Sequence, residues 1–128
     1  MAATWTDLGE LWVNNVLFGS TAPGNLSIGL YLTPTTDPTD TLTLAGITEP
    51  SGNNYSRQTL TRGSWTITND LAAYSQLTFS STGSWGNVYG YFILTGTDLI
   101  AAEKFSNGPY NIQNSGDQIK ITPQIRVS

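Results

Sequence analysis

Nine carboxylates are the groups in this chain best suited to acid–base chemistry, because the sequence contains no histidine and no cysteine. A pair of carboxylates is enough for a glycosidase, which uses one as the acid and the other as base or nucleophile. Most of these groups, however, fall at expected turns or at a helix start, where short acidic residues serve as caps and turn formers. A two-carboxylate hydrolase therefore ranks behind a non-catalytic role. The carboxylates are Asp7, Glu10, Asp37, Asp40, Glu49, Asp70, Asp98, Glu103 and Asp117.

Nucleophilic and metal chemistry have weaker support. A hydrolytic serine needs a neighbouring base, and neither Lys104 nor Lys120 stands in a Ser-x-x-Lys or Gly-x-Ser-x-Gly context. Asp37-Pro38-Thr39-Asp40 offers oxygen ligands to calcium, but it does not follow an EF-hand pattern, and we interpret it as a solvated loop. We expect no catalytic residue, no cofactor and no metal site, and hence no enzyme.

The aromatic residues are the remaining candidates. Exposed rings among Asn, Thr and Asp would suit stacking on sugars or anchoring a protein interface, whereas Trp65 and Phe92 are better explained as core residues. For Tyr89 and Tyr91 both interpretations stay open, because strand alternation places them opposite Val88 and Phe92. Our hypothesis for a subunit or partner contact is the set Trp85, Tyr89, Tyr91 and Ile93.

An N-terminal helix is the first element that the pattern predicts. Apolar residues at Leu8, Leu11, Trp12 and Val16 follow helical spacing, which predicts a helix over about 5–17. Thr4 would cap it with Asp7 as capping-box partner, and Gly19 would end it. Gly9 costs about 1 kcal/mol relative to Ala inside a helix, so this helix must dock against something, on its own domain or on a neighbour.

From residue 26 onward the period changes to two, which predicts strands. The strand over 26–32 should bury one face, and 87–94 should be a central strand, because both of its faces are apolar. Pro123 should place the last strand at an edge or bend it. The other expected elements are an exposed loop over 33–41, a short strand near 42–47, and strands at 55–60, 65–68, 77–80, 99–105, 110–112 and 119–127.

These elements predict a mostly β fold, an antiparallel β-sandwich that is jelly-roll-like, with one short N-terminal α-helix. An immunoglobulin-like topology would also fit the strand spacing. The length of 128 residues suits a single domain over 1–128.

Charge and hydropathy exclude two classes of partner. The net charge is −4, and the five cations Arg57, Arg62, Lys104, Lys120 and Arg126 form no basic stripe, so we expect no nucleic acid partner. The chain shows no secretory signal at its start and no apolar run of about 18 residues, so we expect neither export nor membrane insertion.

The order of elements resembles small virion structural proteins of tailed bacteriophages. The segments that carry the resemblance are Val88-Tyr89-Gly90-Tyr91-Phe92, Ala102-Glu103-Lys104-Phe105 and the run from Gly116 to Pro123, after a helix and a Pro/Thr/Asp loop. They are strand and turn patterns without a chemical signature, and they span nearly the whole chain.

Within that group the chain is similar to capsid decoration (cement) proteins. The resemblance implies a homo-oligomer, often a trimer, that binds the major capsid protein on the outer capsid surface after assembly in the host cytoplasm. The alternative is a tail or neck component that acts as a glycan- or receptor-binding β-sandwich module.

Overall fold

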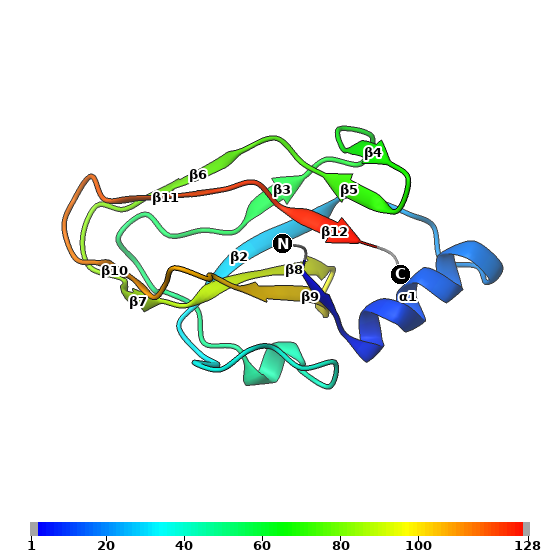
Figure 1. Ribbon diagram of the computed structural model, residues 1–128, viewed down its shortest axis with the longest axis horizontal. Helices are drawn as coiled ribbons and strands as arrows, with labels where there is room; N and C mark the ends of the chain where they lie inside the picture. Colours follow the sequence, from blue (N-terminus) through cyan, green and yellow to red (C-terminus); the bar gives the residue numbers. More distant parts are fainter. Residues whose placement is uncertain (1–2, 127–128) are drawn as a thin grey trace.

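The computed structural model describes residues 3–126, and these residues form a mostly β, antiparallel structure with one α-helix (Figure 1). The elements in chain order are β1 (Thr4–Trp5), α1 (Asp7–Phe18), β2 (Leu26–Tyr31), the 3-10 helix η1 (Leu44–Gly46), β3 (Gln58–Leu60), β4 (Thr66–Thr68), β5 (Leu71–Ala73), β6 (Leu77–Ser80), β7 (Gly86–Val88), β8 (Gly90–Thr95), β9 (Asp98–Lys104), β10 (Tyr110–Ile112), β11 (Gln118–Ile121) and β12 (Gln124–Arg126).

The largest sheet has five strands in the order β1-β9-β8-β2-β3, with every neighbouring pair antiparallel. The central position of β8 confirms the prediction from its two apolar faces. Tyr91 and Ile93 point into the main core cluster, while Phe92 and Leu94 belong to a second cluster on the opposite face. β8 is therefore covered on both sides by its own chain.

The cover over the second face is the loop that contains η1. Leu42, Leu44 and Ile47 pack there against Tyr31 and Phe92. The prediction of a short strand near 42–47 was wrong, because this segment curls into a 3-10 turn that seals the sheet instead of extending it. The strand 26–32 also differs from expectation: Ile28 to Tyr31 are all buried, since β2 is covered by the same two clusters.

Three smaller sheets complete the fold, with strand orders β10-β7, β11-β6 and β12-β5-β4. The predicted strand 87–94 is divided at Tyr89, so that β7 pairs with β10 while β8 belongs to the five-stranded sheet. The predicted strand 119–127 breaks before Gln124, as Pro123 indicated, into β11 and β12. Its last residue, Val127, lies outside the described residues. In the described residues the strands therefore form four separate sheets, and the jelly-roll-like β-sandwich and the single domain over 1–128 stay predictions.

The helix α1 begins two residues later than predicted, because Thr6 and not Thr4 is its N-cap. The Thr6 hydroxyl accepts a hydrogen bond from the Gly9 N–H at 3.0 Å and donates one to the Leu99 carbonyl. Thr4 is instead paired with Ala102 in β1. A Cβ on Gly9 would lie 2.2 Å from the Ile100 carbonyl oxygen, so glycine lets the helix backbone touch β9. Of the two docking alternatives, the helix packs on its own chain.

The helix has 12 residues, and no helix in the part of the chain that the structure describes is long and apolar enough to cross a membrane.

Candidate binding surfaces

The four residues predicted as a contact set do not form a surface. Trp85, Tyr91 and Ile93 are 5%, 2% and 0% exposed, and Tyr89 is half-buried against the second cluster. A side chain enclosed by its own chain cannot meet a partner, so the contact hypothesis is corrected to an interior role for these three. For Tyr91, the structure selects the core interpretation that the sequence left open.

Trp85 and Tyr91 are held by polar contacts as well as by packing. The Trp85 indole N–H donates to the Asn53 carbonyl at 3.1 Å, and its ring meets Tyr55 edge-on at 5.7 Å. The Tyr91 hydroxyl donates to the Glu103 carboxylate at 2.7 Å. Burial raises the pKa of Glu103, an effect that this hydrogen bond partly offsets.

Most carboxylates in the described residues are explained by structural roles: they form ion pairs, accept backbone hydrogen bonds or lie at the start of the helix. Glu49 and Asp70 pair with Arg57 and Arg126 at 2.6 and 2.7 Å. Asp117 accepts hydrogen bonds from the Gln113 and Asn114 N–H groups, and these bonds lower its pKa. Asp7 and Glu10 occupy the first turn of α1, where negative charge suits the helix dipole. Within residues 3–126 no three Asp or Glu side chains gather as a metal site.

A largely apolar hollow, here called the tryptophan groove, lies where α1, β1, β4, β5 and β12 meet. Its volume is about 510 Å³. Three indole rings supply much of its wall, and the lining residues are Trp5, Trp12, Leu26, Arg62, Gly63, Trp65, Ile67, Ala72, Ile100 and Ile125.

Contacts outside the groove fix its walls. The Trp5 indole N–H donates to the Arg126 carbonyl at 2.9 Å, and Trp65 packs edge-on against Tyr74 at 5.1 Å. The Tyr74 hydroxyl in turn accepts from the Thr61 N–H at 3.0 Å. The Arg62 N–H donates to Asn25 at 2.8 Å, and among the described residues its guanidinium forms no ion pair. Contacts within the chain thus fix the positions of the groove walls. The Arg62 side chain gives the groove one positive charge.

Large apolar side chains are exposed in the groove and beside it, at the same end of the molecule. Ile67 lines the groove and is 72% exposed. Leu17 and Phe18 at the end of α1, here called the helix-end pair, are 66% and 84% exposed. In Figure 1 the helix projects beyond the sheets at this end.

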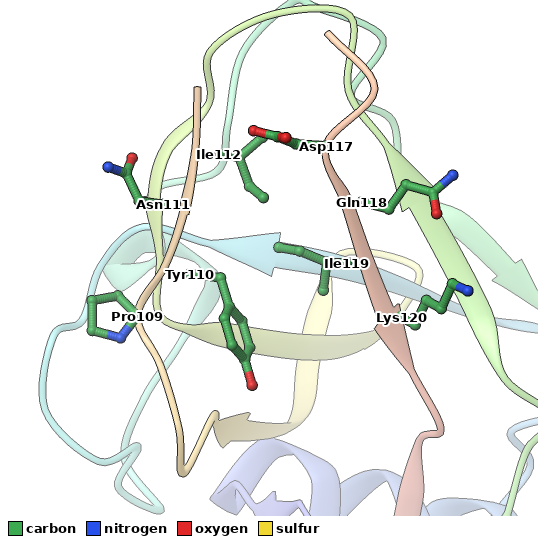
Figure 2. Close-up of a pocket in the computed structure, with 8 residues that line it drawn as sticks. All are labelled: Pro109, Tyr110, Asn111, Ile112, Asp117, Gln118, Ile119 and Lys120. Atoms are coloured by element: carbon green, nitrogen blue, oxygen red, sulfur yellow. The ribbon is translucent and has the colours of Figure 1, made fainter. Parts of the chain in front are cut away.

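A second hollow of about 630 Å³ lies between β10 and β11 and is here called the β10–β11 hollow. Figure 2 shows Ile112 and Ile119 pointing toward each other across it, with the Tyr110 ring below them. Gln118 and Lys120 point away on the far side of β11. Tyr110 is 39% exposed and leans on Phe105 at 5.0 Å. The hollow thus offers an aromatic ring but few converging polar groups.

Sequence reasoning missed the tryptophan groove because the third ring, Trp65, lies far along the chain from Trp5 and Trp12 and no periodic pattern includes it with them. Trp12 was assigned to the docking face of the helix, and it does pack partly against the main core. No local signal joined it to Trp65; the only hint was the number of tryptophans, four in 128 residues.

Comparison with known proteins adds no relative: no family model matches the sequence, and no curated protein or solved structure matches it either.

Proposed function

We propose that this protein is a virion structural protein, a capsid decoration (cement) protein that binds the outer surface of a phage capsid as a homo-oligomer and stabilises it. The sequence resemblance to virion structural proteins of tailed bacteriophages supports a place on the phage particle. The observation that carries the proposal is the concentration of unmatched apolar surface at one end of the molecule, in the tryptophan groove and the helix-end pair.

Such a surface suits protein binding for physical reasons. Contiguous exposed apolar surface on a folded protein marks an interaction site, and tryptophan is enriched among the residues that carry most of the binding energy. Three indoles with fixed positions lose little conformational entropy when a partner docks. The function then needs adhesion and rigidity and uses no reacting group.

The proposal includes the finer fold, a jelly-roll-like β-sandwich. The main cluster takes Ile28 and Ile93 from the five-stranded sheet, and Phe79, Ile119 and Ile125 from the sheets β11-β6 and β12-β5-β4. A core shared between strands of different sheets is what two packed layers require. Such a packed scaffold would keep the groove rigid on the particle surface.

The test is binding to empty shells made from the cognate major capsid protein. We expect the purified protein to co-sediment with the shells at a saturable, fixed stoichiometry and to raise the temperature at which they open. A matched variant, Tyr110→Ser, alters an exposed ring at the β10–β11 hollow and should bind as well as the wild type. Absence of shell binding together with an unchanged opening temperature would refute the proposal.

The second candidate is a glycan- or receptor-binding module of the tail or neck, favoured by the exposed Tyr110 ring in the β10–β11 hollow. Trp85 is buried and cannot stack on a glycan. A glycan array decides: millimolar or tighter binding that disappears in Tyr110→Ala, with shell binding absent, would replace the capsid proposal.

A further inference from the structure

The helix-end pair is an apolar projection without a partner. Phe18 is the most exposed large apolar side chain in the described residues, at 84%, and Leu17 beside it is 66% exposed. An aromatic side chain can remove roughly 150–250 Å² from water when it is buried. Exposure of both side chains to solvent is unfavourable, and a second surface that covered them would remove this cost.

The groove of the same molecule cannot receive this pair. Trp12 already lines that groove, and Phe18 follows it by about 9 Å along the helix axis and roughly a third of a turn away around it. The helix is also fixed near its start by the Thr6 cap and by the contact of Gly9 with Ile100. Reaching the groove would require the helix to unwind.

The groove and the helix end are complementary in charge. The last turn of α1 carries no basic residue, so its free carbonyl groups keep the partial negative charge of a helix C-terminus. Arg62 in the groove has no carboxylate partner among the described residues. A helix C-terminus entering the groove would bring these two charges together while its apolar residues meet the indoles.

We propose that the tryptophan groove of one copy binds the helix-end pair of a second copy of this chain. Leu17 and Phe18 enter the apolar hollow, and the terminal carbonyl groups of α1 face Arg62. The volume of about 510 Å³ is within the range of pockets that enclose whole small ligands, so it can hold these side chains. The inference rests on the proposed role in assembly and identifies the surface through which that assembly forms.

The contact joins two different surfaces, so each copy gives one helix end and accepts another. Such a head-to-tail contact closes into a ring when the rotation between copies allows it. A trimer, the state that the resemblance implies, is one such ring.

Sedimentation velocity across a concentration series tests the contact. We expect a discrete oligomer for the wild type and monomers for Phe18→Ser and for Ile67→Asp, each weakening association roughly thirtyfold or more. Both replaced side chains are largely exposed, so circular dichroism should show an unchanged fold. Arg62→Glu should weaken association in the same direction, and Tyr110→Ser, at the other hollow, should leave it unchanged.

Mixing the two monomeric variants is the sharper experiment. Phe18→Ser keeps an intact groove and Ile67→Asp keeps an intact helix end, so one good contact remains possible between them. We expect a one-to-one complex that grows no further. A monomeric wild type, an oligomer unaffected by Phe18→Ser, or a mixture without the complex would each overturn the inference. A monomer that still binds shells would overturn this contact and leave the proposed binding to the capsid standing.

Discussion

Two buried tyrosines of the five-stranded sheet differ in whether their hydroxyl groups find a partner. The Tyr91 hydroxyl donates to Glu103, whereas the Tyr31 hydroxyl, on a fully buried side chain, has no hydrogen-bond partner in the described residues. Burial raises the pKa of both phenols, so both are neutral at ordinary pH. A buried polar group without a partner costs free energy that its removal recovers.

The matched variants Tyr31→Phe and Tyr91→Phe should therefore differ in sign. We expect Tyr31→Phe to leave the free energy of unfolding unchanged or to raise it by up to about 1 kcal/mol, and Tyr91→Phe to lower it by about 1–2 kcal/mol. Urea denaturation measures both. If Tyr31→Phe lowered the free energy of unfolding as much as Tyr91→Phe, the Tyr31 hydroxyl would have to be hydrogen-bonded in the folded protein.

Glu103 makes the stability of the protein depend on pH. Burial raises the pKa of Glu103 in the folded state. In the pH range that begins at the ordinary glutamate pKa, the folded state therefore keeps a proton on Glu103 that the unfolded state has lost. The free energy of unfolding then falls as the pH rises through that window. Glu103→Gln removes the ionisation and keeps an acceptor for Tyr91.

We expect Glu103→Gln to unfold at a higher temperature than the wild type at pH 7, and the difference to shrink toward pH 4. Thermal unfolding followed across this pH range is the measurement. Glu10→Gln, at an exposed position in the first turn of α1, is the control and should bring no gain at pH 7. If Glu103→Gln raised the unfolding temperature equally at pH 7 and pH 4, the stability of the protein would not depend on the ionisation of Glu103.

At the scale of elements, the junction of α1 with β9 shows tertiary packing overruling helix propensity. Alanine in place of Gly9 would favour an isolated helix by about 1 kcal/mol. In the protein its Cβ would meet the Ile100 carbonyl at 2.2 Å, and backbone cannot yield as a flexible side chain can. The helix would have to lift from the sheet, and with it Trp12 and one wall of the tryptophan groove.

Gly9→Ala should consequently destabilise the protein by about 1–3 kcal/mol. Gly24→Ala is the matched control, because nothing lies within 4 Å of the added Cβ, and it should change stability by less than about 0.5 kcal/mol. Chemical denaturation compares the two. Stabilisation by Gly9→Ala would mean that the helix does not dock as closely as described.

At the scale of the whole molecule, self-association through the tryptophan groove links stability to concentration. A partner that binds only the folded state raises the melting temperature as its concentration rises. We expect the melting temperature of the wild type to increase over about a hundredfold range of protein concentration. That of Phe18→Ser should stay constant, and differential scanning calorimetry at several concentrations records both. A constant melting temperature for the wild type would argue against assembly.

The amino-acid sequence by itself determined the class of fold and several element positions. Alternation predicted the antiparallel β character, the two apolar faces of 87–94 predicted the centrality of β8, and Pro123 predicted the break before β12. These predictions succeed because the period of burial along a strand or helix is local information. The single α-helix was predicted for the same reason.

Tertiary structure alone decided what covers each face and which side chains stay outside. The same apolar faces of β8 would suit a neighbouring subunit as well as the loop that contains η1. Periodicity shows that a face is buried, but it does not show which element or subunit covers that face. Likewise, Trp5, Trp12 and Trp65 converge only after β9, α1 and the sheet β12-β5-β4 have come together. Long-range pairing sets that arrangement, and no spacing along the chain encodes it.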